Sequence, residues 1–204
     1  MTAPLYIIDY GSGNLRSVQK AFERVGVQAE VGGDVAGIRD ARGLVLPGVG
    51  AFGSAMEELE RRGLAEVIRE RVEAGVPFLG VCLGQQLLFE SSEESPGVAG
   101  LGLLEGAVRL LPVQLKVPHI GWNTIEIAKA SPVLEAIPNG SAFYFVHSFV
   151  VTPRRPGDVL TFTEYGVGFA SGVERDNVVA FQFHPEKSSS LGLEIYRNFA
   201  RNLC

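Results

Sequence analysis

Short apolar runs alternate with amphipathic stretches over the first 82 residues, and this alternation limits what the chain can fold into. Strands are predicted for the runs LYIID, VQAEV, GLVLPG and VPFLGV, which begin at Leu5, Val27, Gly43 and Val76. We expect Pro47 to break the third of them. The fourth is almost wholly apolar, as is typical of a central parallel strand that is buried on both faces.

Two amphipathic helices are predicted between these strands. In residues 14–25, Leu15, Val18 and Phe22 recur at helical spacing, and a glycine follows as a stop signal. A longer helix is predicted over residues 54–74, again followed by glycine. Strands that alternate with helices in this way are typical of a parallel sheet covered by helices, in which ligand sites lie at the carboxyl ends of the strands.

The second half of the chain is built from shorter runs. After about residue 100, segments such as AVRLL, AFYFVHSF, DVLTFTEYG and VVAFQF are separated by turn residues, which favours antiparallel strands added to the sheet. Residues 189–203 are expected to form a closing helix. With 46% hydrophobic residues and neither a repeat nor a biased linker, we predict a single domain over residues 1–204. Its fold class is mixed α/β, a mostly parallel open sheet flanked by helices with additional antiparallel strands.

Composition excludes several classes of partner. A formal net charge of −5 without a Lys or Arg run argues against nucleic acid. The amino terminus has no basic region before its short apolar stretch, so we expect no membrane association and a cytoplasmic protein. The two cysteines, Cys82 and Cys204, do not indicate a disulfide framework, and Cys204 is expected to be a frayed surface thiol. We expect neither a metal ion nor a cofactor.

Cys82 lies in the stretch GVCLG, between an apolar strand and a predicted helix. A strand that turns sharply into a helix can hold its turn residue in a strained conformation when the flanking positions carry little side chain, and Gly80 and Gly84 meet this need. The helix expected to start at Leu83 offers free N–H groups and a positive dipole end, and both favour a thiolate. Cys82 is therefore a candidate nucleophile, although a small buried packing residue explains the same motif.

A nucleophilic cysteine needs a base, and the chain has three histidines, His119, His147 and His184. His184 ends a β-rich run, and we expect Pro185 to keep the chain extended, so that His184 and Glu186 point the same way. Glu186 would then hold the imidazole in the tautomer that accepts a proton. His147 lies in an apolar run without an acid, so we interpret it as a hydrogen-bonded core histidine.

The motifs GVCLGQQ and FQFHPE together, in this order and spacing, resemble those of the class I glutamine amidotransferases. The resemblance covers nearly the whole chain and implies a flavodoxin-like three-layer sandwich. In this family a cysteine, a histidine and a glutamate release ammonia from glutamine through a γ-glutamyl thioester. The resemblance assigns this triad to Cys82, His184 and Glu186.

The segments IIDYGSGNLRSV, LPGVGAFG, HIGWN and FYFVHSF resemble one subfamily, the glutaminase subunits of imidazole glycerol phosphate synthases. The glycine-flanked Val49, with Gly50, is expected to supply an oxyanion donor opposite the Leu83 N–H. The family pattern assigns glutamine binding to four positions, namely Gly50, Gln86, Ser148 and Phe149. Where this chain has Ser148 and Phe149, the subfamily often has threonine and tyrosine, so a hydroxyl contact at position 149 is absent.

The subfamily resemblance also implies a partner. It would be the cyclase subunit of imidazole glycerol phosphate synthase, a (β/α)8 barrel, bound as a heterodimer and supplied with ammonia. The cyclase would make imidazole glycerol phosphate and aminoimidazole carboxamide ribotide in histidine biosynthesis. The face toward this partner is expected to include Asn14, Trp122, Asn123, Tyr144 and Lys187.

Three other functions stay open at this point. The chain can be the glutaminase subunit of another class I amidotransferase, or a stand-alone hydrolase of γ-glutamyl or peptide bonds. It can also be a binding module whose cysteine senses oxidation. The His184–Glu186 pair argues against the sensor, and the HIGWN segment argues against the free-standing hydrolase.

Overall fold

The computed structural model of the chain describes residues 3–204. The first part of the chain follows the predicted alternation of strands and helices, although α2 was not predicted. Its elements are β1 (Leu5–Ile8), α1 (Leu15–Arg24), β2 (Ala29–Gly32), α2 (Val35–Asp40), β3 (Gly43–Gly48), α3 (Phe52–Arg61), α4 (Leu64–Glu73), β4 (Phe78–Cys82) and α5 (Leu83–Gln86).

The second part is built mainly from strands. They are β5 (Ser91–Ser92), β6 (Gly106–Leu110), β7 (His119–Thr124), β8 (Glu126–Ile127), β9 (Ala142–His147), β10 (Phe149–Pro153), β11 (Val159–Glu164), β12 (Gly168–Arg175) and β13 (Val178–Phe181). Helix α6 (Ser189–Asn198) follows and continues as a π turn, η4 (Phe199–Leu203). Short 3-10 turns occur at η1 (Pro132–Leu134), η2 (Pro156–Asp158) and η3 (Pro185–Lys187).

Eleven of the strands in the described residues form one sheet, and β7 and β9 form a second. The main path of the large sheet is β2-β1-β3-β4-β13-β12-β10-β6-β5; off this path β11 pairs with β12, and β8 pairs with β11. Strands β2, β1, β3, β4 and β13 are parallel neighbours, and β12, β10 and β6 follow antiparallel. The predicted fold class is confirmed, and the parallel strand order is the doubly wound one.

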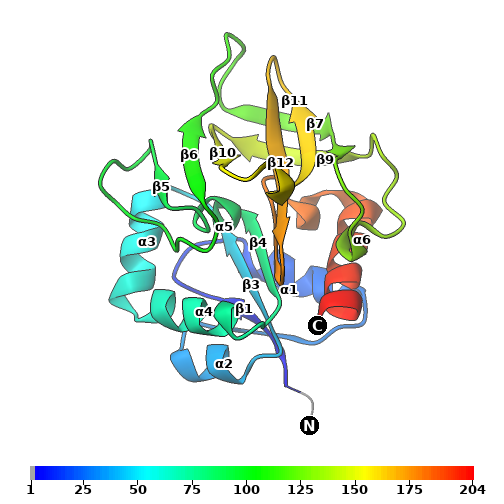
Figure 1. Cartoon of the computed structure of the whole chain (residues 1–204). Helices are drawn as coiled ribbons and strands as arrows, with labels where there is room; N and C mark the ends of the chain where they lie inside the picture. The colour runs from blue at the N-terminus through cyan, green and yellow to red at the C-terminus, as the bar shows by residue number, and fades with distance from the viewer. Residues whose placement is uncertain (1–2) are drawn as a thin grey trace.

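Helices cover both faces of the parallel strands (Figure 1). In β1, Tyr6 and Ile8 pack into one apolar core with α2, α3 and α4, whereas Leu5 and Ile7 pack into the other with α1 and α6. All four residues of β1 are buried, which explains why the central strands are continuous apolar runs. None of the helices in residues 3–204 has the length and apolar character that crossing a bilayer requires.

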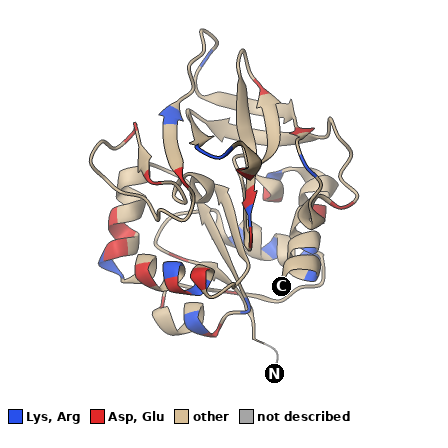
Figure 2. Cartoon of the chain, viewed as in Figure 1, with Lys and Arg blue, Asp and Glu red and all other residues tan. Residues whose placement is uncertain are grey.

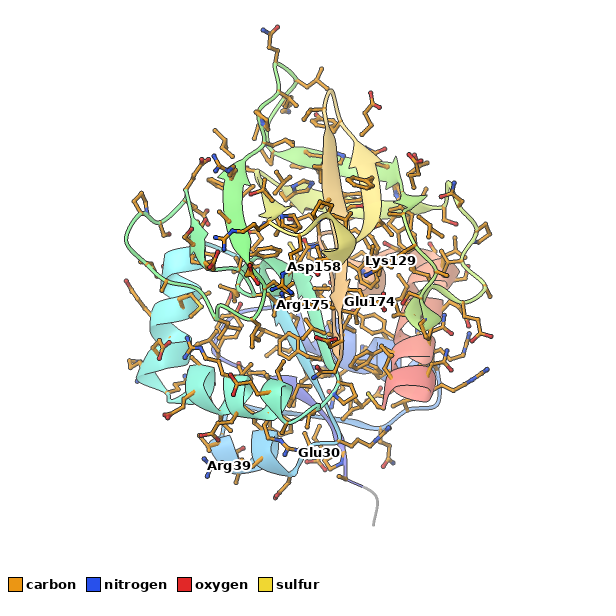
Figure 3. The ribbon with its side chains drawn as sticks, in the orientation of Figure 1. Glu30, Arg39, Lys129, Asp158, Glu174 and Arg175 are labelled. Atoms are coloured by element: carbon orange, nitrogen blue, oxygen red, sulfur yellow. The ribbon has the colours of Figure 1, made fainter. Side chains whose placement is uncertain are left out.

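Charged side chains lie mainly outside these cores. Acidic and basic residues alternate along α3 and α4, where Glu58 pairs with Arg61 and Arg62 (Figure 2). Two further ion pairs close the end of β12, where Arg175 lies 3.6 Å from Asp158 and Glu174 lies 3.7 Å from Lys129 (Figure 3).

Several expectations about the elements are wrong, each for a local reason. The single helix over 54–74 is two helices, because Gly63 takes a left-handed φ of 68° between them. Pro47 does not break its strand: β1 pairs only with Gly43–Val45, so the missing N–H falls where β3 has one neighbour left.

Two further observations differ from the predictions: an additional helix, α2, and the half-buried position of Cys204. Helix α2 was not predicted, although Asp34 caps it by accepting a hydrogen bond from the Gly37 N–H at 2.8 Å. Cys204 is not a frayed surface thiol. It packs half-buried against the core beside Gly43, and burial raises its pKa to about 12.

Candidate active site

The carboxyl ends of β3, β4 and β13 meet at one edge of the sheet. Gly48 pairs with Cys82 there, and β13 leads directly toward His184. A cavity of about 240 Å³ opens at this edge. It is lined by all the catalytic, oxyanion and glutamine-binding residues expected from the sequence except Glu186, namely Val49, Gly50, Cys82, Leu83, Gln86, Ser148, Phe149 and His184.

Cys82 is held in a rare backbone conformation at the turn from β4 into α5. Its φ is 55° and its ψ is −110°, a region that residues with a side chain seldom adopt. The turn depends on close packing, since a Cβ at Gly84 would lie 1.8 Å from the Leu46 carbonyl oxygen. Helix α5 begins at Leu83 as predicted but ends at Gln86. In so short a helix, the first-turn N–H groups, which have no acceptor within the helix, matter more than a summed helix dipole.

His184 is oriented by Glu186. Its Nδ1 donates to Glu186 Oε1 at 2.8 Å, and both side chains are almost fully buried. Glu186 Oε2 also accepts a hydrogen bond from the Tyr196 hydroxyl at 3.3 Å. The chain is not extended here as we expected. Pro185 starts a 3-10 turn, which brings the two side chains together by curling.

The charge state of His184 follows from competing effects. Burial on its own lowers the pKa of His184, but the neighbouring Cys82 thiol and the Glu186 carboxylate outweigh burial and raise the pKa to about 9. The imidazole is therefore protonated at neutral pH. A protonated imidazole beside a sulfur nucleophile is suited to act as a general acid, because it can give its proton to the leaving group after the sulfur has attacked.

The Cys82 sulfur has two polar neighbours besides His184. The Gln182 side-chain amide donates to Sγ at 3.8 Å, and the thiol faces the Val146 carbonyl oxygen at 3.8 Å. Gln182 is fully buried and also accepts a hydrogen bond from Gln86 Nε2 at 3.0 Å. The arrangement of thiol, buried imidazole and carboxylate can form and cleave an acyl thioester.

The family description "Glutamine amidotransferase class-I" matches residues 6–203. The chain belongs to this family. Two solved structures share its fold: a "Crystal structure of glutamine amidotransferase" matches over 96% of each chain with a TM-score of 0.75 at 23% identity. The "Structure of PurLQS from Thermotoga maritima" covers all of both chains with a TM-score of 0.77 at 20% identity.

Curated relatives are much more similar in sequence. "Imidazole glycerol phosphate synthase subunit HisH" of Moorella thermoacetica is 53% identical, and the match covers 96% of this amidotransferase and 93% of the relative. The proteins of the same name from Aquifex aeolicus and Methanothermobacter thermautotrophicus are 55% and 50% identical. The match to the Aquifex protein covers 96% of this chain and 95% of the relative. The match to the Methanothermobacter protein covers 95% of this chain and 96% of the relative.

The oxyanion candidates of this amidotransferase lie on two sides of Cys82. Leu83 is the first residue of α5, and Val49 and Gly50 follow β3. The Val49 carbonyl accepts a hydrogen bond from the Ser12 hydroxyl at 2.7 Å, and Gly50 has a φ of 103° that favours glycine. The assignment of these residues as donors stays a prediction.

Three of the four glutamine-binding candidates, Gln86, Ser148 and Phe149, form one wall of the cavity, whereas the fourth, Gly50, follows β3. Gln86 Nε2 donates to the Phe149 carbonyl at 3.2 Å, and the Ser148 carbonyl accepts from the Leu111 N–H at 2.9 Å. Among residues 3–204 the Ser148 N–H has no acceptor, which leaves it available to a ligand. The roles of Gln86, Ser148 and Phe149 likewise stay predictions.

Three of the five residues predicted for the partner face form one group. Trp122 packs edge-on against Tyr144 at 6.1 Å between ring centroids, and Lys187 Nζ lies 5.8 Å from the Tyr144 ring centroid. Asn123 follows Trp122 on β7, but its side chain lies on the other face of the strand, where it contacts His119 and the Glu164 carbonyl. Asn14 lies at the start of α1, and within the described residues no hydrogen bond joins it to the other four.

Two buried or cavity-lining side chains were missed by the sequence analysis. Glu94 lines the cavity and accepts the Phe52 N–H at 2.8 Å, and Gln182 contacts Cys82. Gln182 stands within the quoted FQFHPE motif, whereas Glu94 lies in an acidic run that reads as solvated surface. Over residues 3–204, no three His, Cys, Asp or Glu side chains are grouped so as to hold a metal ion.

Proposed function

We propose that this chain is the glutaminase subunit of an imidazole glycerol phosphate synthase and that it hydrolyses L-glutamine to L-glutamate and ammonia. The observation that carries the proposal is the buried His184–Glu186 pair, which faces a strained cysteine in a cavity of amino-acid size. Relatives about 50% identical over nearly their whole length, named as the HisH subunit of that synthase, support the choice of subfamily.

The first half-reaction forms a thioester on Cys82. The sulfur attacks the side-chain amide carbon of glutamine, and the carbonyl oxygen takes up the negative charge. Backbone N–H groups of Leu83 and of the Val49–Gly50 segment are expected to bind this oxyanion. As the carbon–nitrogen bond breaks, the protonated His184 gives its Nε2 proton to the leaving nitrogen, which departs as ammonia.

The second half-reaction regenerates the enzyme. His184, now neutral, accepts a proton from a water molecule that attacks the thioester carbon. The carbon–sulfur bond breaks, glutamate leaves, and the pair of Cys82 sulfur and His184 returns to its starting protonation. Glu186 keeps its hydrogen bond to Nδ1 throughout, so that Nε2 always faces the reacting atoms.

The cavity can recognise both charged ends of an amino acid. Glu94 is a carboxylate on the cavity wall, suited to the α-ammonium group of glutamine. The Ser148 N–H, which has no acceptor among residues 3–204, is suited to the α-carboxylate. Gln86 orders this wall through its hydrogen bonds to Phe149 and Gln182.

The ammonia is proposed to pass to the cyclase subunit, a (β/α)8 barrel that would form a heterodimer with this chain in the cytoplasm. The cyclase would convert it into imidazole glycerol phosphate and aminoimidazole carboxamide ribotide in histidine biosynthesis. The exposed Trp122 packs against the half-buried Tyr144, which lies next to the cavity-lining Lys187, and this arrangement supports docking of a partner at the mouth of the site.

A coupled assay tests the function. Glutamate formation is measured for the chain alone, with the cyclase, and with the cyclase and its nucleotide substrate. We expect turnover to rise with the partner, because a glutaminase that works without an acceptor wastes glutamine.

Cys82→Ala is expected to abolish glutamine-dependent synthesis and to leave synthesis from added ammonium salt intact, because the acceptor chemistry takes place on the partner. Cys204→Ala is the matched control and should keep full activity. Glutamine hydrolysis by the Cys82→Ala chain would contradict the assignment of the nucleophile.

A further inference from the structure

Two histidines that the proposed mechanism does not use lie buried beside the cavity. His119 on β7 and His147 on β9 are directly paired across the small sheet, and their exposed fractions are only 3% and 6%. The His119 ring stacks on Tyr165 with centroids 4.0 Å apart and on Phe145 at 5.0 Å. Because buried polar groups are normally hydrogen-bonded, each ring nitrogen of these two imidazoles is expected to have a hydrogen-bond partner.

The direction of each hydrogen bond follows from the atoms involved. His147 Nδ1 lies 3.0 Å from the Phe149 carbonyl oxygen, which can only accept, so Nδ1 carries the proton. Burial lowers the pKa of His147 to about 3, so the ring is neutral and its Nε2 is an acceptor. His119 Nδ1, 3.0 Å away, must therefore donate to it.

Asn123 completes the chain of hydrogen bonds. Burial also lowers the pKa of His119, so its Nε2 is an acceptor, and it faces Asn123 Nδ2 at 3.3 Å. The orientation of this amide is fixed independently: Nδ2 donates to the Glu164 carbonyl at 2.8 Å, and Oδ1 accepts the Thr124 N–H at 2.8 Å. In each hydrogen bond of this chain the donor therefore precedes the acceptor in the order Asn123, His119, His147 and the Phe149 carbonyl.

The end of this chain is at the glutamine-binding wall. The hydrogen bond from His147 Nδ1 to the Phe149 carbonyl closes a ring that contains the backbone of Ser148. This ring restricts the direction in which the Ser148 N–H points. The Phe149 carbonyl also accepts from Gln86, so both of its lone pairs are engaged. A neutral histidine in the other tautomer would turn an acceptor toward this carbonyl and repel it.

We propose that His119 is a positioning residue for glutamine binding: by donating from Nδ1 it holds His147 in the Nδ1–H tautomer, which fixes the Ser148–Phe149 wall. This inference rests on the proposed glutaminase function. His119 touches neither substrate nor the reacting atoms, so it acts on the affinity for glutamine rather than on the chemical steps. Asn123 plays the same part for His119.

Two substitutions separate hydrogen bonding from packing. His119→Phe keeps an aromatic ring between Tyr165 and Phe145 but has no donor. His119→Asn loses the ring but can place its side-chain amide where Nδ1 was. Tyr165→Phe, which keeps the stacked ring and loses only a hydrogen bond to the Lys116 carbonyl, is the matched control.

The kinetic test uses the complex with the cyclase. His119→Phe is expected to raise the KM for glutamine about 3- to 10-fold, the effect of one lost hydrogen bond, with kcat within about twofold of wild type. His119→Asn should recover most of the affinity, and Tyr165→Phe should match wild type. An unchanged KM in His119→Phe, or a rise in KM only in His119→Asn, would overturn the proposal in favour of a packing role.

Nitrogen-15 NMR of the histidine rings gives a readout that needs no activity. Both His119 and His147 are expected in the Nδ1–H tautomer in the wild-type chain, and His147 is expected to lose that preference in His119→Phe. An Nε2–H tautomer at His147 in the wild type would overturn the inference even if the enzyme is active. Absence of glutamine hydrolysis by the wild-type complex would instead overturn the proposed function.

Discussion

At the scale of single residues, the neighbours of His184 control its charge. Burial lowers the pKa of His184, but the Cys82 sulfur and the Glu186 carboxylate together raise it to about 9, above the ~6.5 of a histidine in an unfolded chain. The contacts of the protonated His184 with these two groups therefore stabilise the fold fully below about pH 6.5, and this contribution is lost as the pH rises through about 9.

Glu186→Gln should accordingly destabilise the chain more at pH 6 than at pH 10. Urea unfolding of both proteins at the two pH values measures the difference. The same substitution should lower kcat less than His184→Ala does, because an imidazole without its partner still samples the productive tautomer part of the time. Equal losses of kcat for the two variants, or a destabilisation that grows with pH, would argue against this role.

Glu94 supplies the second prediction at this scale. If its carboxylate binds the α-ammonium group, Glu94→Gln should raise the KM for glutamine by about 10- to 100-fold, as expected for a lost charge-assisted hydrogen bond, with a smaller change in kcat. Glu93→Gln is the matched control, because Glu93 pairs with Arg109 outside the cavity. Steady-state kinetics with the cyclase present measure both variants, and equal KM values would remove Glu94 from substrate binding.

The sequence identifies the site residues only in part. Cys82, His184 and Glu186 were identifiable because they lie in short local motifs, and the structure brings all three together. Glu94 reaches the site through packing between segments far apart in the chain, and such contacts leave no local pattern. Gln182 lies within the FQFHPE motif, but its contact with Cys82 joins residues 100 positions apart. The His119–His147 link depends on strand register, which the apolar run around His147 does not reveal.

At the scale of elements, the tight turn from β4 into α5 is held by backbone contacts. The Gly84 Cα faces the Leu46 carbonyl so closely that a Cβ would lie 1.8 Å from the oxygen. Since that oxygen belongs to the central strand β3, neither side can move without distorting the sheet. The glycine is thus required by packing, in addition to the room it gives the nucleophile.

Gly84→Ala should therefore lower the free energy of unfolding by at least ~1–3 kcal/mol, the usual cost of overpacking. Gly157→Ala is the control, because nothing lies within 4 Å of a Cβ there and its φ is ordinary, so a change within ~0.5 kcal/mol is expected. Thermal unfolding followed by circular dichroism compares the two. Equal melting temperatures would mean that the turn is looser than its contacts imply.

Element positions were predictable where a single rule decides them. Continuous apolar runs located β1, β3 and β4, because strands buried on both faces need no polar residues. The division of α3 from α4 depends on one left-handed glycine, and the 3-10 turn at Pro185 is closed by the Lys187 N–H, which donates to the His184 carbonyl. Both are single local turns, which the spacing of apolar residues does not reveal.

At the scale of the whole molecule, the small sheet of β7 and β9 joins the active site to the surface. Trp122 and Ile120 on β7 are 55% and 58% exposed, unusual for large apolar side chains. Tyr144 pairs with Trp122 across the sheet and lies next to Lys187, which lines the cavity. A partner that covers this surface would therefore sit beside the mouth of the cavity.

Trp122→Ala is expected to weaken binding of the cyclase by about 30-fold or more, corresponding to the ~2 kcal/mol that a central aromatic residue commonly contributes to an interface. Val31→Ala is the matched control: Val31 is also exposed, at 37%, but lies on β2 at the opposite edge of the large sheet. Titration calorimetry gives both dissociation constants.

At saturating cyclase the Trp122→Ala chain should regain glutaminase activity, because the triad is untouched. Equal affinity of Trp122→Ala and wild type would exclude this sheet as the docking surface, whereas a loss of affinity in Val31→Ala would move the interface to the other edge.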